Sequence, residues 1–250
     1  MTKNESTHLS CSLGAGGELT IACDAWEGFS LPRLSPGLGI DGKDRVPDGF
    51  KLLAPGAGEL WAGEHAFGDD AWLELRCSQS GPGGVVIAPF LRAGPRGLTL
   101  NRVTLLASGS TAPRFGGNPA RVTVMEQRGY SGGVSPLAPR ERVRSASEET
   151  AFGTQKPDDA ERSSSFFWLA FDRDAGRAFL AGFLSAERWI GRMTLVTDAG
   201  GGVLSWRAGF DGGDLSAGSG ERIPLEPLLL RAGANPWRML EETGPACRGA

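Results

Sequence analysis

The stretch from residue 166 to residue 183, FFWLAFDRDAGRAFLAGF, sets the expected fold of this chain. Two apolar runs, Phe166–Phe171 and Ala178–Ser185, flank a short polar segment, Asp172–Gly176. Short runs rich in aromatic residues are typical of strands, and the glycine suits a turn that needs a positive φ. The stretch therefore predicts an antiparallel β-hairpin.

A second hairpin is predicted directly downstream, with arms Met193–Thr197 and Val203–Phe210 around the turn Asp198–Gly202. In its second arm two sets of residues alternate: Leu204, Trp206, Ala208 and Phe210 against Val203, Ser205, Arg207 and Gly209. Successive side chains of a strand point to opposite faces of a sheet, so this pattern predicts one buried and one wetter face.

Apolar and β-branched runs also recur upstream, separated by clusters of Gly, Pro, Asp or Ser. We expect strands at Leu19–Cys23, Ala71–Cys77, Val85–Leu91 and Leu98–Ala107. The 38 glycines and 16 prolines of the 250 residues suit many tight turns between short strands. The expected fold is all-β, a large antiparallel β-sandwich that spans residues 1–234.

Two segments depart from the strand pattern. Residues 136–165 are rich in Pro, Arg, Glu, Asp and Ser, and we expect a long loop there. Near the end of the chain, Asn235 can cap a helix and Pro236 can occupy its first position, while Gly244 and Pro245 would end it. Residues 235–250 are therefore expected to form a short helix and the start of a linker.

Charge and composition argue against several partners. The formal net charge is −3 with both signs interspersed, so nucleic acid and membrane surfaces are not expected partners. The first ten residues are polar, and no apolar run is long enough for a signal or a membrane span, so a cytoplasmic location is expected.

The metal-binding residue types are few and scattered. Cys11, Cys23, Cys77 and Cys247 show no CxxC spacing, and His8 and His65 are the only histidines. We expect no metal site and no cofactor, and we expect the cysteines to be reduced thiols, although a Cys11–Cys23 bridge across a hairpin remains open.

No catalytic constellation emerges from the sequence. The paired carboxylates are adjacent in sequence, which points them to opposite faces of a strand: Asp69 with Asp70, Glu148 with Glu149, Asp158 with Asp159, and Glu241 with Glu242. His8 lies in a polar terminus, and His65 is expected in a loop rich in Gly and acidic residues, without a GxSxG motif near either. No catalytic residue is therefore predicted in this chain.

Two segments resemble a known family. Residues Ser165–Gly191, SFFWLAFDRDAGRAFLAGFLSAERWIG, resemble the strand pair before the catalytic barrel of glycoside hydrolase family 36, the clan of α-galactosidases and raffinose-synthase-like enzymes. A later pattern resembles the closing segment of the same domain: Gly220, Glu221, Leu225, Glu226, the apolar Leu228–Leu230, Gly233, Asn235 and Pro236. The resemblance covers roughly Arg121–Glu242.

This resemblance implies an N-terminal β-supersandwich whose relatives carry catalysis in a following (β/α)₈ barrel, by a retaining mechanism with two carboxylates about 5 Å apart. It implies a non-catalytic accessory domain that packs on such a barrel, in cis or in a separate chain, and supports oligomerisation. Gly129 and Tyr130 match a family loop of the pattern Asn-Gly-aromatic-Gln-Ser-Trp that approaches the α-galactoside, while its Asn, Gln and Trp are missing here. Gly129 and Tyr130 are the substrate-binding candidates.

The accessory interpretation predicts an exposed apolar docking face at Trp189, Trp237 and Leu240. Two other kinds of function stay open. The alternative is an independent carbohydrate-binding module, with Trp26, Trp61 and Trp72 as its sugar platform. A structural β-sandwich without any ligand remains the third interpretation.

Overall fold

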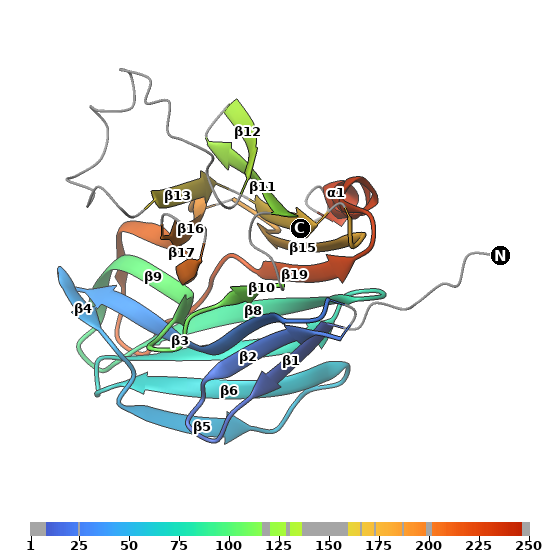
Figure 1. The fold of residues 1–250 in the computed structure, drawn as a ribbon. Coiled ribbons are helices and arrows are strands. Elements are labelled where there is room, and N and C mark those ends of the chain that lie inside the picture. The colour runs from blue at the N-terminus through green and yellow to red at the C-terminus, as the bar shows by residue number, and fades with distance from the viewer. Residues whose placement is uncertain are drawn as a thin grey trace, which may run out of the picture.

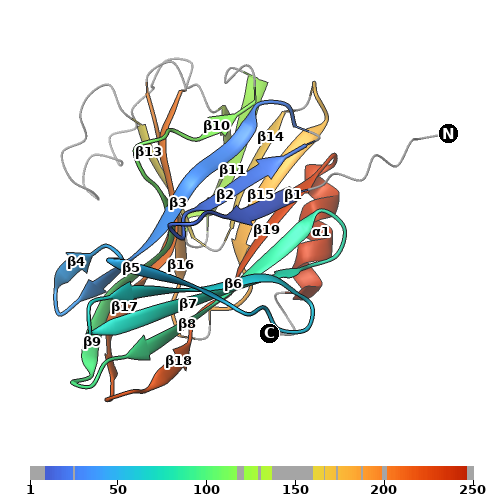
Figure 2. The ribbon, with the colours of Figure 1, turned by 90° about the horizontal axis from the view of Figure 1, so that it is seen from below.

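The computed structural model describes residues 9–24, 26–116, 121–128, 131–136, 160–165, 167–172, 174–186, 188–198 and 202–246. Two large sheets pack face to face, and one short helix, α1 (Pro236–Ala246), lies beside β15 and β19 (Figures 1 and 2). The strand pairs within both sheets are antiparallel. The predicted fold, an antiparallel β-sandwich with a short C-terminal helix, is confirmed.

The first sheet, called sheet A, has nine strands in the order β1-β2-β3-β9-β17-β16-β13, with β4 and β10 paired to β3. Their bounds are β1 (Leu9–Leu13), β2 (Leu19–Cys23), β3 (Phe29–Ile40), β4 (Lys43–Arg45), β9 (Leu98–Ser108), β10 (Arg114–Phe115), β13 (Ala160–Ser165), β16 (Gly191–Thr197) and β17 (Val203–Ala217).

The second sheet, called sheet B, has ten strands in the order β12-β11-β14-β15-β19-β8-β7-β6-β5, with β18 paired to β8. Their bounds are β5 (Gly49–Leu53), β6 (Glu59–Phe67), β7 (Ala71–Gln79), β8 (Gly84–Ala93), β11 (Val122–Arg128), β12 (Ser131–Pro136), β14 (Phe167–Asp172), β15 (Arg177–Phe183), β18 (Arg222–Pro224) and β19 (Leu228–Gly233).

One hydrophobic core fills the space between the sheets. Both sheets contribute to it, and its largest fully buried side chains are Trp168 and Phe179 from sheet B and Trp206 and Phe210 from sheet A. Aromatic rings bury large apolar areas, so these four residues stabilise the contact between the sheets more than the small residues around them.

The predicted hairpin is β14–β15, and it is buried on both faces. Trp168 faces the core, whereas Leu169 and Leu180, which pair across the strands, form a second cluster with Met239 of α1. This double burial explains the continuous apolar run, because a strand covered on both faces loses the alternation of a half-exposed strand. In the turn, Asp172 Oδ1 accepts bonds from the N–H groups of Asp174 and Ala175 at 3.0 and 3.1 Å, and Gly176 has φ 59°.

Helix α1 begins as predicted. Asn235 Oδ1 accepts hydrogen bonds from the backbone N–H groups of Trp237 at 3.0 Å and Arg238 at 3.2 Å, and Pro236 is the first helical residue. The predicted end at Gly244 and Pro245 is wrong, because the helix runs to Ala246.

Three other sequence expectations need correction. Pro136 ends β12 and Ala160–Ser165 form β13, so the predicted loop of residues 136–165 is bounded by strands, and its residues 137–159 lie outside the described ranges.

Strand β17 extends past Phe210 to Ala217. At its start Val203 is buried and Leu204 is exposed, the reverse of the prediction, because a register shift between Val196 and Thr197 places Val203 opposite Thr197.

Candidate functional site

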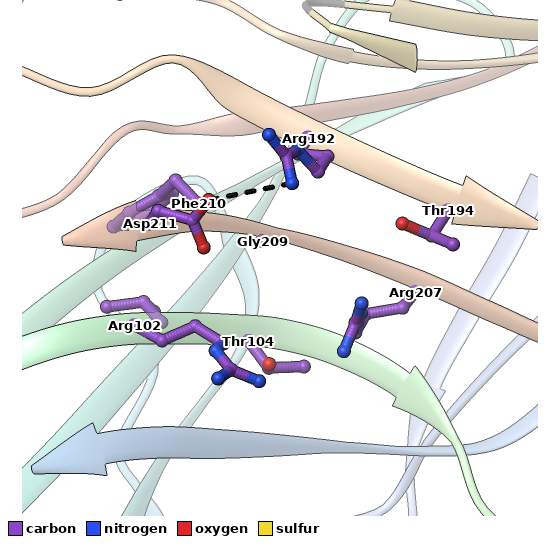
Figure 3. Close-up of a pocket in the computed structure, with 9 residues that line it drawn as sticks. Arg102, Thr104, Arg192, Thr194, Arg207, Gly209, Phe210 and Asp211 are labelled. Carbon is purple, nitrogen blue, oxygen red and sulfur yellow. Dashed lines mark ion pairs between the residues drawn. The ribbon is translucent and has the colours of Figure 1, made fainter. Parts of the chain in front are cut away.

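A polar pocket lies on the outer face of sheet A, over the neighbouring strands β9, β17 and β16. Its volume is about 260 Å³, and Arg102, Arg192 and Arg207 stand around it, one on each of the three strands (Figure 3). The other lining residues are Val103, Thr104, Thr194, Gly209, Phe210 and Asp211.

Strand register brings these residues together. Arg192 lies opposite Gly209, which lies opposite Thr104, while Asp211 lies opposite Arg102. Directly opposed residues of antiparallel strands share one face, so the three strands present a continuous polar surface. The intervening Val103, Met193 and Phe210 are buried in the core.

Gly209 makes the floor of the pocket. A Cβ at this position would lie 2.2 Å from the carbonyl oxygen of Val103 and 3.0 Å from Thr104 Cα. No side chain therefore fits there, and the surface between Arg192 and Thr104 stays hollow. The polar residues around this hollow form its walls.

The arginines of the pocket are only loosely paired. Arg192 Nη1 lies 3.7 Å from Asp211 Oδ2, and Arg102 Nη1 lies 3.6 Å from Asp44 Oδ2 on β4, which pairs with β3. Both distances exceed those of N–H···O hydrogen bonds. Arg207 is exposed and has no carboxylate partner within the part of the chain that the structure describes. The guanidinium donors therefore stay available to a ligand.

The chemistry of this pocket is recognition of an anion. Guanidinium groups bind carboxylate and phosphate oxygens through charge-assisted hydrogen bonds, and the lining carries three positive charges against one carboxylate, Asp211. A retaining glycosidase needs two carboxylates across the scissile bond, and this lining has one. Among the described residues no group of three or more His, Cys, Asp or Glu side chains is placed to hold a metal ion.

The three tryptophans of the predicted sugar platform differ in burial. Trp26 and Trp61 are buried, with 3% and 8% of their surface exposed. The Trp26 ring stacks on Phe29 at 5.1 Å, and Trp61 Nε1 donates a hydrogen bond to the carbonyl oxygen of Cys11 at 3.0 Å. Trp72 is half-buried, with the Arg92 guanidinium 4.0 Å above its ring. Gly129 and Tyr130 lie outside the described residues.

The three residues of the expected docking face differ in exposure. Trp189 is buried, 8% exposed, and stacks on Phe210 with the ring centroids 5.0 Å apart. Leu240 packs partly against the cluster under α1. Trp237, at 53% exposed, is the one whose indole faces outward. The expected face is therefore reduced to Trp237 and the exposed part of Leu240.

Cys11 and Cys77 are neighbours across the two sheets. Cys11 and Cys77 are free thiols, and Cys11 lies opposite Ile21 in the β1–β2 pair, not opposite Cys23. The Cys77 thiol, together with burial, raises the pKa of the Cys11 thiol. A raised pKa keeps this thiol protonated and unreactive.

His65 is not in a loop, as the sequence suggested, but in strand β6, facing the core. It is 2% exposed, beside Phe50, and its Nε2 atom is buried without a hydrogen-bond partner among the described residues. Burial lowers the pKa of His65 to about 4. The correction follows from the alternation in β6, where Trp61, Gly63, His65 and Phe67 all point inward.

Sequence reasoning missed the arginine pocket. Arg192 and Arg207 each stand between two buried residues, as in Gly191-Arg192-Met193 and Trp206-Arg207-Ala208, whereas Arg102 follows the half-buried Asn101. The alternation could have placed Arg192 and Arg207 on an outer face. It could not show that the three strands are neighbours, since β9 and β17 are about a hundred residues apart in the chain.

The structure thus defines an all-β sandwich with an arginine-lined pocket on one outer face. No protein-family model matches the chain, and no curated protein sequence matches it. Among solved structures it is similar to the galactosidase domain of the α-galactosidase–sucrose kinase AgaSK, with 10% identity over 86% of this chain and 31% of that chain, at a TM-score of 0.49.

Two further structures are similar at lower scores. One is an α-galactosidase from Lactobacillus brevis, with 10% identity over 96% of this chain and 40% of that chain, at a TM-score of 0.36. The other is a GalM/aldose epimerase homologue from C. elegans, with 8% identity over 91% of this chain and 99% of that chain, at a TM-score of 0.40. The chain spans less than half the length of the two α-galactosidase structures.

Within the described ranges, the structure contains no helix with the length and apolar character of a membrane span.

Proposed function

We propose that this chain is a non-catalytic accessory domain of an α-galactosidase-like glycoside hydrolase, and that it packs on a (β/α)₈ barrel carried in cis or by a separate chain. Residues 1–234 are the supersandwich in this proposal, and residues 235–250 lead towards the barrel. The observation that carries it is that the two segments with family resemblance, separate in sequence, form one substructure.

Backbone pairing supplies the first contact between those segments. β15 of the hairpin pairs with β19, with Leu180 opposite Arg231 and Phe183 opposite Leu228, and the N–H of Leu184 donates to the carbonyl of Pro227 at 2.9 Å. Helix α1 then packs on the outer side of the same hairpin through Met239. The two segments therefore depend on each other for their backbone hydrogen bonds and burial.

Glu226 supplies the second contact. This carboxylate is buried, 4% exposed, and accepts hydrogen bonds from the Ser185 hydroxyl and from the backbone N–H of Arg188 at 3.0 Å. A buried carboxylate is costly unless it is hydrogen-bonded. Glu226 therefore holds in place the segment after β15, which carries Trp189 and the exposed Ile190. Within the pattern of residues 220–236, Glu226 thus has a structural role.

Two features fit a docking role without catalysis. Trp237 and Ile190 are exposed at 53% and 61%, next to this substructure, and large apolar side chains are common at the centres of interfaces. The pocket of sheet A has one carboxylate in its lining, whereas the retaining reaction needs two.

The test is co-fractionation of the natural protein with enzyme activity. An extract of the source cells is separated by size, and an antibody against this chain is used to deplete it, with aryl α-galactoside hydrolysis as the readout. We expect the activity to follow the chain and to be removed with it, while the purified 250-residue chain shows no turnover. Elution as a free protein of about 26 kDa, apart from every α-galactosidase fraction, would contradict the proposal.

Calorimetry separates this proposal from the carbohydrate-binding module. The purified chain is titrated with galactose, melibiose and raffinose, and the accessory role predicts no saturable heat. Saturable heat with these neutral sugars would support the module instead. Turnover by the isolated chain would contradict both.

A further inference from the structure

The outer pocket of sheet A offers both hydrogen-bond donors and hydrogen-bond acceptors to a ligand. Arg102, Arg192 and Arg207 supply guanidinium donors that no described acceptor fills at hydrogen-bonding distance. Thr104 and Thr194 supply hydroxyl groups, which can donate or accept, and Asp211 supplies a carboxylate acceptor. Such a set complements a ligand that carries an oxyanion and also several hydroxyl groups.

We propose that this pocket binds a small acidic carbohydrate, a monosaccharide that carries one carboxylate or phosphate group. The oxyanion lies among the three guanidinium groups, and the sugar hydroxyls bond to Thr104, Thr194 and Asp211. The pocket is on sheet A, whereas α1 and the exposed Trp237 of the proposed docking face lie against sheet B; Ile190, the other exposed apolar residue, is two residues before Arg192.

The size of the pocket limits the ligand. Its volume of about 260 Å³ lies just below the usual range for small-molecule sites, about 300–1,000 Å³, so it suits a single sugar ring and not an oligosaccharide. The glycine floor at Gly209 lets a ligand approach the backbone between Arg192 and Thr104.

The charge of the pocket decides against neutral sugars. Arg192 and Arg102 keep about half of their side chains exposed, at 50% and 46%. A neutral ligand would cover these guanidinium groups and replace only part of their hydration. An oxyanion replaces that hydration with charge-assisted hydrogen bonds, which are about twice as strong as neutral ones.

The binding experiment uses the purified 250-residue chain at neutral pH and low salt, followed by calorimetry. The probes are galacturonate and galactose 6-phosphate as the two acidic sugars, with galactose and inorganic sulfate as comparisons. We expect saturable binding of at least one acidic sugar, and about tenfold weaker binding of galactose and of sulfate, because each lacks one half of the recognised chemistry. Binding of galacturonate alone would identify the recognised oxyanion as a carboxylate, and binding of galactose 6-phosphate alone would identify it as a phosphate.

Two single variants locate the site. Arg207→Gln and, separately, Arg192→Gln remove one guanidinium each, and we expect about tenfold weaker binding of the acidic sugar. Arg238→Gln, which removes the same charge from the exposed side of α1, is the matched control and should bind as the wild-type chain does. Circular dichroism confirms that the variants fold.

Four outcomes would overturn the proposal. They are no saturable binding of either acidic sugar, equal binding of galactose, equal binding of inorganic sulfate, and an affinity that neither Arg207→Gln nor Arg192→Gln weakens. The third outcome would leave a simple anion site without sugar recognition. None of the four bears on co-fractionation with α-galactosidase activity, so the two proposals can fail separately.

Discussion

The outer faces of the two sheets both carry arginine side chains, but these differ in how closely carboxylates hold them. On sheet B, Arg76 Nη1 donates to both carboxylate oxygens of Glu59 at 2.9 and 3.0 Å, and its Nε donates to Glu74. On sheet A, the ion pairs of Arg102 and Arg192 are 3.6 and 3.7 Å long. Arg76 of sheet B is thus hydrogen-bonded within the chain, while the pocket arginines Arg102 and Arg192 of sheet A are not held at hydrogen-bonding distance by a described carboxylate.

Aromatic rings extend this difference. On sheet B, the guanidinium of Arg92 lies 4.0 Å above Trp72 and donates to Glu64 at 3.1 Å, and that of Arg222 lies 3.9 Å from the ring of Phe90. A guanidinium held by a carboxylate and a ring has few donors left for a ligand. The comparison teaches that arginine count does not identify a binding site, whereas the distances from each arginine to its acceptors do.

The difference is also electrostatic. Hydrogen bonds from Arg76 to Glu59 and Glu74 raise the pKa of the Arg76 guanidinium. The backbone N–H of Gly56, with Arg76, lowers the pKa of the Glu59 carboxyl. The charged groups of sheet B thus stabilise one another, and we infer that they support the fold.

The largest expected effect concerns the floor of the open pocket. Gly209→Ala places a methyl group 2.2 Å from the carbonyl oxygen of Val103, and a backbone atom must move to admit it. We expect a loss of about 3 kcal/mol in the free energy of unfolding, measured by urea denaturation. Gly37→Ala is the matched control, because Gly37 lies opposite Thr104 on the same face and its Cβ would meet no atom closer than 3.4 Å. Equal stability of the two variants would show that the pocket floor does not require glycine.

The next largest effect is the pH dependence of stability that arises from His65, which also sets the pH range for binding measurements on the pocket. Burial lowers the pKa of His65 to about 4 from its usual value of 6.5. As pH falls, the unfolded chain binds the proton first, so the stability contribution of neutral His65 is complete above pH 6.5 and is lost as pH falls towards about 4. A loss of about 2–3 kcal/mol is expected over this range.

His65→Gln should remove that part of the acid dependence. The measurement is urea denaturation of the wild-type chain and the variant at several pH values, and the difference between the two curves isolates His65 from the carboxylates. A wild-type curve with the same acid slope as the variant would show that His65 is not held neutral in the core. Binding to the pocket should accordingly be measured above pH 6.5.

The sequence predicted those features that depend on local chemistry. The β14–β15 hairpin follows from its apolar runs and from an Asx turn at Asp172 that ends at Gly176, and the start of α1 follows from Asn235 and Pro236. These contacts join residues within a few positions of one another. Local pattern is therefore sufficient for them.

The candidate site depends on contacts that the sequence does not encode locally. The pocket exists because β17 pairs with both β9 and β16, which places Arg102 opposite Asp211. Glu74, two residues before Arg76, is a local sign that Arg76 is paired, but its other partner, Glu59, lies on the neighbouring strand β6 and is placed by the fold. Likewise Trp26 and Trp61 are next to glycines and acidic residues in sequence, yet the fold buries both rings.

A smaller effect tests whether the charges of sheet B support the fold. Arg76→Ala leaves Glu59 and Glu74, whose side chains are 18% and 14% exposed, without their shared partner. We expect a loss of about 1–2 kcal/mol in the free energy of unfolding, less at high salt because the network is partly screened. Arg33→Ala, which breaks a pair whose arginine is 64% exposed, is the control with an expected effect near zero. Equal losses in the two variants would mean that the sheet B network adds nothing beyond an ordinary surface pair.

The smallest effect is expected at the open face, and it decides the comparison. Arg207 is exposed and has no hydrogen-bonded acceptor within the described ranges, so Arg207→Ala removes no interaction that holds β17 in place. The free energy of unfolding should change by less than about 0.5 kcal/mol, as is usual for surface positions without partners. Measured beside Arg76→Ala under the same conditions, this variant separates an arginine that stabilises the sandwich from one that is available to a ligand. A loss as large as that of Arg76→Ala would show that Arg207 also stabilises the fold. The arginines of the two faces would then not differ in their contribution to stability.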